Sequence, residues 1–263
     1  MDIFSLYFSP TGGTKKVTEL IAREFGHHES VDLTKEGQYQ KYEFAKEDIC
    51  IIGAPAYGGR IPDIMLSRLR QMKADGAQAI VVIAYGNRAI DDAMLELRNE
   101  LTMIGFHVVA GLEAVTEHSI VRTYGAGRPD ERDIIELKTY GNLLWDAMKN
   151  GERLEAVNVP GNEPYREYNG VPAKPKSGKG CTHCGTCVNL CPVGAITKDD
   201  KHINTDNNRC ISCMRCVKEC PVGARMVNKL VMAAMNKKLK KLCAGHKENV
   251  LYWKETLDLH TQK

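Results

Sequence analysis

Two cysteine runs in the last third of the chain constrain its fold more than any other feature. Eight of the ten cysteines lie between residues 181 and 220, and the other two are Cys50 and Cys243. Both runs have the spacing C-x2-C-x2-C-x3-C-P, formed by Cys181, Cys184, Cys187, Cys191 and Pro192 and by Cys210, Cys213, Cys216, Cys220 and Pro221. In a reducing compartment, such regular clustering favours metal ligation over disulfides. The surrounding segment is also too poor in apolar residues to form a core unaided.

The two runs resemble those of two-cluster bacterial ferredoxins, in which cysteines hold two [4Fe–4S] clusters. The resemblance covers Gly178 to Met226, and Pro-Val-Gly-Ala recurs at 192–195 and 221–224, as expected of an internal repeat. It implies that the proline after each run directs the fourth cysteine to the opposite cluster. One cluster would be held by Cys181, Cys184, Cys187 and Cys220, and the other by Cys191, Cys210, Cys213 and Cys216.

Structural zinc is the alternative, because C-x2-C pairs also form zinc sites. A zinc site takes four ligands from two pairs, whereas each run here has a third cysteine at the same spacing and a fourth before proline. We therefore predict iron–sulfur clusters. We expect His183 and His202 to lie at the surface or donate to sulfur, since the thiolates already complete both sites.

The first half of the chain alternates apolar runs with amphipathic stretches. We predict strands at 1–8, 30–33, 48–54, 79–85 and 107–115, and helices at 14–25, 62–72, 91–104 and 133–149. Continuously apolar strands are typical of a sheet covered on both faces. The alternation therefore predicts the α/β class, with a doubly wound, parallel, five-stranded sheet.

A segment rich in proline and glycine follows this half. We predict a first domain at 1–151, a connector at 152–176, a small α+β cysteine domain at 177–228 and a helical tail at 229–263. Apolar residues in the tail recur at helical spacing beside a lysine-rich stretch. This pattern favours a C-terminal helix packed on one of the domains over a helix that binds a membrane or a partner.

The loop after the first strand is suited to binding a phosphate. Its sequence, Ser9-Pro10-Thr11-Gly12-Gly13-Thr14, precedes a helix whose amino end favours an anion. The P-loop and G-x-G-x-x-G patterns are absent, which argues against a nucleoside triphosphatase and weakens a nicotinamide dinucleotide site. A capped helix after a tight turn is the alternative. The loop resembles the phosphate loop of flavodoxins, and this implies FMN binding by Ser9, Thr11, Gly12, Gly13 and Thr14.

Two further loops should lie beside this one. In a sheet of flavodoxin order, the ligand lies outside the carboxyl ends of the first and third strands. The loops after the third and fourth strands resemble those that bracket the flavin in flavodoxins, which implies contacts from Pro55, Ala56, Tyr57, Gly58, Gly59, Arg60, Tyr85, Gly86, Asn87 and Arg88. Tyr57 is the first candidate for stacking on the flavin and Tyr85 the second. Arg60 and Arg88 could lie near the N1–O2 edge of the flavin, with surface salt bridges as the alternative.

Taken together, the layout resembles the flavodoxin–ferredoxin fusion proteins of anaerobes over nearly the whole chain. The resemblance implies a cytoplasmic carrier that moves electrons between FMN and two [4Fe–4S] clusters, with redox proteins as donor and acceptor. A flavin-dependent reductase of a small substrate, fed by the clusters, and an iron–sulfur redox sensor remain alternatives.

The bulk properties exclude other classes. No hydrolytic signature is present. The net charge of +3 gives no strong case for a nucleic-acid partner, and no apolar run is long enough to span a membrane. The amino-terminal sequence MDIFSLYFSP lacks the basic start of a signal peptide, so we expect a strand there. Oligomeric state is left open.

Overall fold

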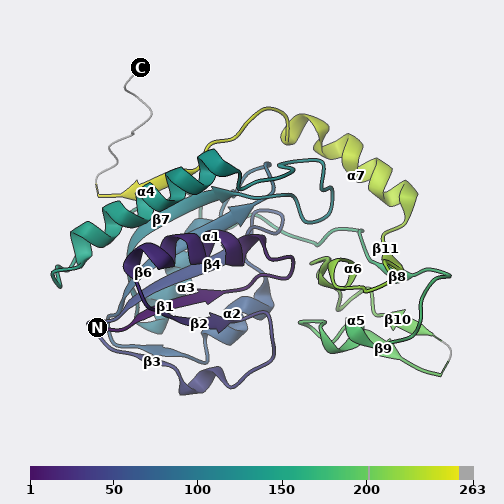
Figure 1. Cartoon of the computed structure of the whole chain (residues 1–263), viewed down its shortest axis with the longest axis horizontal. Helices are drawn as coiled ribbons and strands as arrows, with labels where there is room; N and C mark the ends of the chain where they lie inside the picture. The colour runs from purple at the N-terminus through teal and green to yellow at the C-terminus, as the bar shows by residue number, and fades with distance from the viewer. Residues whose placement is uncertain (201, 255–263) are drawn as a thin grey trace.

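A computed structural model describes residues 1–200 and 202–254. A six-stranded sheet forms the centre of the first domain (Figure 1). Its strands, from edge to edge, are β2 (Glu29–Asp32), β1 (Ile3–Tyr7), β4 (Ile49–Pro55), β6 (Gln78–Tyr85), β7 (His107–Val115) and β12 (Val250–Trp253). The first five pair in parallel. Counted along the chain their order is 2-1-3-4-5, which is the flavodoxin-like order, so the predicted five-stranded parallel sheet is confirmed.

Helices cover both faces of this sheet. On one face α1 (Gly13–Ala22) and α4 (Glu131–Met148) pack their apolar side chains, including Val17 and Leu144, against the central strands. On the other face α2 (Asp63–Leu69) and α3 (Ala93–Ile104) do the same with residues such as Met65 and Leu97. Every residue of β4 and β6 is buried, as continuously apolar strands require.

The cysteine domain lies beyond the carboxyl ends of the central strands (Figure 1). It is built from short elements: β8 (Lys176–Ser177), α5 (Thr186–Asn189), β9 (Ile196–Lys198), β10 (Ile203–Thr205), α6 (Arg215–Lys218) and β11 (Arg225–Met226). β9 pairs with β10 and β8 with β11, both antiparallel. The segment that leads into this domain is tied to the first one. Val157 is buried and its amide donates to the carbonyl of Val108, and the Asp92 carboxylate accepts the amides of Asn162 and Arg166.

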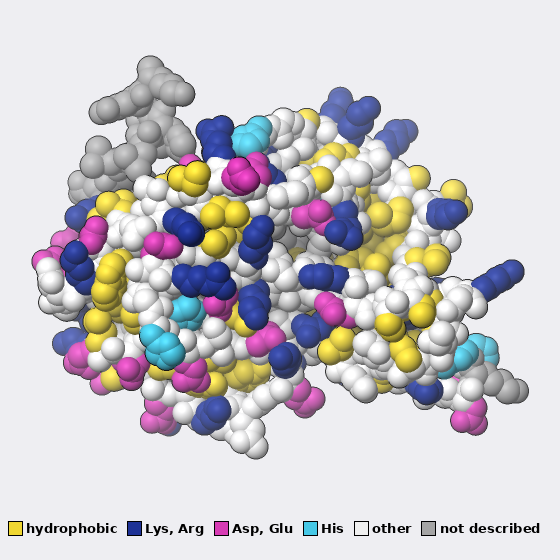
Figure 2. Space-filling model, viewed as in Figure 1, with side chains coloured by type: hydrophobic (Ala, Val, Ile, Leu, Met, Phe, Trp, Pro, Cys, Tyr) yellow, Lys and Arg dark blue, Asp and Glu magenta, His cyan; other side chains and the backbone are white. Residues whose placement is uncertain are grey.

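The chain returns to the first domain after the cysteine domain. Helix α7 (Lys229–Leu242) leads back, and β12 then pairs antiparallel with β7 as an additional edge strand. The sequence predicted the helix but not this strand, and residues 255–263 of the predicted tail lie outside the described residues. None of the residues of α7 is fully buried and Leu230 is 80% exposed, but Met235 and Leu239 are half-buried, and the Tyr124 hydroxyl of the sheet domain donates to the Asn236 side chain at 2.7 Å. Figure 2 shows hydrophobic side chains gathered at the surface below this helix.

Two smaller features complete the fold. β3 (Glu43–Phe44) and β5 (Lys73–Ala74) form a separate parallel pair, and short 3-10 turns lie at Arg23–Phe25 and Tyr39–Lys41. Within the described residues, no helix has the length and apolar character needed to cross a membrane.

Candidate functional site

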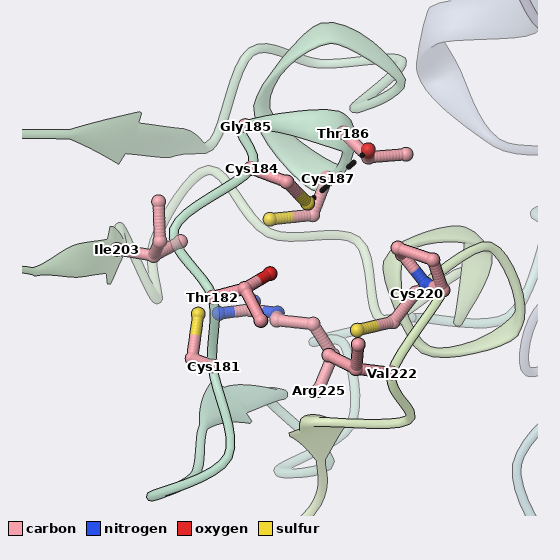
Figure 3. Close-up of a pocket in the computed structure, with 11 residues that line it drawn as sticks. Cys181, Thr182, Cys184, Gly185, Thr186, Cys187, Ile203, Cys220, Val222 and Arg225 are labelled. Atoms are coloured by element: carbon pink, nitrogen blue, oxygen red, sulfur yellow. Dashed lines mark hydrogen bonds between the residues drawn. The ribbon is translucent and has the colours of Figure 1, made fainter.

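The eight clustered cysteines line two cavities, and each cavity takes cysteines from both runs. One, which we name the Cys220 cavity, is lined by Cys181, Cys184, Cys187 and Cys220. The other, the Cys191 cavity, is lined by Cys191, Cys210, Cys213 and Cys216. The fourth cysteine of each run thus lies with the first three of the other run. Figure 3 shows the four sulfur atoms of the Cys220 cavity facing a common space.

The backbone of the two runs repeats the same unusual conformations. His183 and Ser212, two residues after the first cysteine of each run, both have positive φ. Gly185 and Met214 also have positive φ, at 82° and 60°, and each is the N-cap of the short helix that carries the third cysteine. A non-glycine residue is strained in this region. The two runs therefore share one loop shape, and in each run the first three cysteines line the same cavity.

Backbone amides and hydroxyls reach the cysteine sulfurs. The amides of Ala195 and Ala224 donate to Sγ of Cys191 and Cys220, each at 3.2 Å. The Thr186 hydroxyl lies 3.3 Å from Sγ of Cys184 and lowers the pKa of that thiol (Figure 3). Burial instead raises the pKa of Cys213 to about 12. Cys213, in the Cys191 cavity, is therefore shielded from solvent. Cys184, in the Cys220 cavity, is exposed.

Each cavity also has an arginine with a buried, unpartnered nitrogen. Nε of Arg225, in the Cys220 cavity, and Nε of Arg215, in the Cys191 cavity, are buried and have no acceptor among the described residues. Buried donors without acceptors are rare in folded proteins. No three His, Cys, Asp or Glu side chains in the described part of the chain are arranged to hold a single metal ion. Four thiols and an open cationic donor fit a larger anionic group with acceptor atoms, as the thiolate-held cluster is.

The predicted phosphate loop lies between β1 and α1. Gly12, with φ of 86°, caps the helix, and the Ser9 hydroxyl accepts the amide of Lys15 at 2.8 Å. The first amides of a helix have no partner within it. Within the described residues the amides of Gly13 and Thr14 have no acceptor. This arrangement offers two open donors at the positive end of a helix, and it fits a phosphate.

The loop after β4 forms a tight turn. Tyr57 and Arg60 exchange backbone hydrogen bonds across Gly58 and Gly59, both of which have positive φ. A side chain at Gly58 would overlap the ring of Tyr168, so the connector lies directly on this turn. Tyr57 is half-buried, and its pKa is raised, first by burial and then by the neighbouring Cys213. The turn therefore contacts the connector, and Tyr57 is close enough to Cys213 for the two side chains to interact electrostatically.

The loop after β6 is covered by the returning tail. Tyr85, the second candidate for stacking, is buried within the core. Asn87 is also buried, and its side-chain amide donates to the carbonyls of Cys243 and Gly245 at 2.8 and 3.0 Å. A side chain at Gly86 would collide with His118. Pro55 ends β4, and Ala56 donates its amide to Ala84, so the two loops lie side by side.

Both predicted arginines form the salt bridges that we considered as the alternative. Arg60 donates through Nε and Nη2 to Glu96, at 2.9 and 2.6 Å, and its guanidinium lies 5.0 Å from the Tyr165 ring centre. Arg88 pairs with Asp91. Glu96 lies on α3 and Asp91 in the turn before it, so both guanidinium groups have carboxylate partners in this conformation.

Ile211 of the cysteine domain packs against the core of the sheet domain, and hydrogen bonds join the two domains in the described part of the chain. Lys218, on α6, donates to the carbonyl of Thr11 at 2.6 Å, so its ammonium group lies at the phosphate loop. Arg68, on α2, donates to the carbonyls of Leu33 and Pro192 at 2.7 and 2.9 Å. The sequence analysis missed Lys218, Tyr168 and Arg225. Only Arg225 had a signal, since it replaces the apolar residue found at the same place in the first run.

Comparisons with known proteins agree with this layout. The family described as "4Fe-4S dicluster domain" matches residues 180–224, and a comparison with curated protein sequences gives no significant match. Among solved structures, a flavodoxin from the domain Archaea aligns over 57% of this chain and 99% of its own, at 13% identity and a TM-score of 0.40. A flavodoxin of Streptococcus pneumonia TIGR4 aligns over 56% and 100%, at 18% identity and a TM-score of 0.41. Rubredoxin oxygen:oxidoreductase of Desulfovibrio gigas aligns over 57% and 36%, at 16% identity and a TM-score of 0.41.

These low scores carry no argument of their own, and the strand order defines the fold of the first domain. The chain therefore joins a flavodoxin-like domain to a 4Fe-4S dicluster domain, a combination that suggests electron transfer. This is the layout of a flavodoxin–ferredoxin fusion, as the resemblance in sequence implied.

Proposed function

We propose that this protein is an electron carrier in which FMN, bound by the flavodoxin-like domain, exchanges electrons with two [4Fe–4S] clusters in the dicluster domain. The observation that carries the proposal is the pair of cavities, each lined by four cysteines drawn from both runs. Both cavities lie in a domain that contacts the phosphate-loop edge of the sheet. Redox proteins would be the donor and the acceptor, in the cytoplasm, where thiols stay reduced.

The chain's own residues would hold these groups in different ways. Thr11, Gly12, Gly13 and Thr14 would bind the FMN phosphate through open amides and the helix dipole. Tyr57 is the candidate that would lie against the flavin ring, and its position beside Cys213 would place that ring near the Cys191 cavity. When bound, FMN exchanges one or two electrons and each cluster exchanges one.

The cysteine assignment would follow the two cavities. Amides of Ala195 and Ala224 would stabilise the negative charge on the crossing thiolates of Cys191 and Cys220, because hydrogen bonds to sulfur favour the charged form. Burial of Cys187, Cys213 and Cys216 would exclude water from one side of each cavity.

Quantification of the bound groups tests the proposal. Protein purified without oxygen should contain about eight iron atoms and eight acid-labile sulfides per chain, the content of two [4Fe–4S] clusters, and one FMN. Zinc in place of iron would overturn the cluster assignment. Iron and sulfide without flavin, in a protein that fails to rebind FMN, would instead favour the redox sensor. Saturable oxidation of the bound flavin by a small molecule would favour the reductase.

A further inference from the structure

The internal repeat of the dicluster domain is broken at one buried position. Each run ends in Cys-Pro-Val-Gly-Ala, and the next residue is Ile196 after the first run and Arg225 after the second. The two residues occupy equivalent places, since each begins a short strand and lines a cavity. The repeat therefore places an apolar side chain beside the Cys191 cavity and a guanidinium beside the Cys220 cavity.

Arg225 is buried and has no carboxylate partner among the described residues. It is 2% exposed, and its Nη2 donates to the Pro175 carbonyl and the Thr205 hydroxyl, both at 2.8 Å. Nη1 donates to the Ser177 hydroxyl at 3.1 Å, and Nε has no acceptor. All three oxygens are neutral. A buried charge is costly unless an opposite charge lies near it, so the fold needs an anion at this point.

The anions within reach belong to both cavities. Nη2 of Arg225 lies 3.8 Å from Sγ of Cys216, which lines the Cys191 cavity, while the side chain itself lines the Cys220 cavity. In Figure 3 the Arg225 side chain extends from the Cys220 side of the cavity toward Cys181. The guanidinium thus lies between the two sets of cysteines.

We propose that Arg225 is a counter-charge shared by the two clusters, which favours the reduced, more negative form of each. This inference rests on the proposed function, because it needs both clusters to be bound. Adding an electron to either cluster increases the negative charge beside the guanidinium, and the buried site screens that attraction poorly. Arg215 differs, since it lines the Cys191 cavity alone and lies where the first run has Thr186. It should act on one cluster only.

The experiment compares the reduction potentials of the clusters in variants that replace a residue of the second run with its equivalent in the first run. Arg225→Ile, the residue of the first run, should shift the reduction of both clusters to lower potential in a titration followed by electron paramagnetic resonance. Arg215→Thr should shift one. Arg209, which is exposed and donates to the Val193 carbonyl at 2.8 Å, provides the control, and Arg209→Gln should shift neither. Full iron content with both potentials unchanged in Arg225→Ile would overturn the proposal.

A second pair of variants covers the case in which Arg225→Ile does not assemble its clusters. Arg225→Lys keeps the charge and Arg225→Gln removes it at similar length. The lysine variant should retain potentials close to those of the wild type, whereas the glutamine variant should have both lowered. Equal shifts in these two variants would show that geometry rather than charge is responsible. Absence of iron from the wild-type protein would overturn the proposed function itself, and iron counted in every sample separates that outcome from the others.

Discussion

Lys218→Met should weaken the binding of FMN and leave the binding of riboflavin unchanged. Lys218 belongs to the dicluster domain, yet its Nζ lies 2.6 Å from the Thr11 carbonyl oxygen. The same nitrogen would be 2.9 Å from a Cβ atom added to Gly12. A cation from the second domain is therefore held where the flavodoxin-like domain would bind a phosphate. Riboflavin lacks the phosphate, so the comparison separates this charge from contacts to the ring.

The expected magnitude follows from the position of the ammonium group. Two unit charges about 4 Å apart near a protein surface interact by roughly 4 kcal/mol. Lys218 is exposed, so solvent and salt screening reduce the net contribution to about 1 kcal/mol. This corresponds to about a fivefold increase in the Kd for FMN. The increase should shrink at high salt, as expected for a screened charge.

Quenching of flavin fluorescence on titration with the apoprotein measures both affinities. Lys237→Met, on the exposed surface of α7, is the matched control because it removes one lysine away from the loop. The reasoning is refuted if Lys218→Met binds FMN as tightly as the wild type. It is also refuted if FMN and riboflavin weaken equally, since the lysine would then act on domain contact rather than on the phosphate.

Three further predictions concern ligation, stability and acid. Cys220→Ser should retain about half of the wild-type iron, and adding Cys181→Ser should cost no more, since both line one cavity; loss of nearly all iron from the double variant would contradict the crossed assignment. Asn249→Ala should lower the free energy of unfolding, measured in urea, by about 3 kcal/mol, because it leaves a buried amide of β7 without an acceptor and removes two hydrogen bonds to carboxylates. A loss below about 1 kcal/mol would argue against this network. Burial alone would raise the pKa of Asp133, but hydrogen bonds from Arg128, Asp130 and Asn249 hold it below its ordinary value. The stability that these bonds supply is therefore present above the pKa of the unfolded state and is lost as the pH falls through the pKa of the folded state. Urea unfolding of Asp133→Asn should lack this acid-dependent loss, and a loss as large as that of the wild type would assign it to another group.

The parallel sheet could be predicted from sequence because its signal is local. β4 and β6 are continuous apolar segments, and helical periodicity separates them from the strands that follow. β12, with the sequence VLYW, is also a continuous apolar run, but it is only four residues long and lies far along the chain from the rest of the sheet. Its four residues are all half-buried, and they form a strand because Asn249 is fixed against the end of β7 and the carboxylates of α4. That interaction joins residues far apart in sequence, and a local pattern does not contain it.

The candidate site divides in the same way. Cysteine spacing is a local pattern that repeats in the two runs, so the candidate ligand residues could be identified without a structure. Arg60 and Arg88 could not be placed, because their acidic partners come from α3 and the turn before it. Lys218 had no signal at all, since only the packing of two domains brings α6 to the phosphate loop. Arg225 could have been found by aligning the two runs and asking which buried position had changed from apolar to charged.

The way the chain is threaded decides which parts of the dicluster domain remain available to a partner. The connector enters this domain from the sheet, and α7 and β12 return from it, so the domain is tethered at both ends. Because the dicluster domain is tethered at both ends and bonded to the sheet domain through Lys218 and Arg68, we expect the two domains to keep one fixed arrangement. Pro192, which lines the Cys191 cavity, accepts a hydrogen bond from Arg68 of α2, so this cavity lies on the side of the sheet domain. The Cys220 cavity has the exposed Cys184, so we expect an external redox partner to exchange electrons on that side.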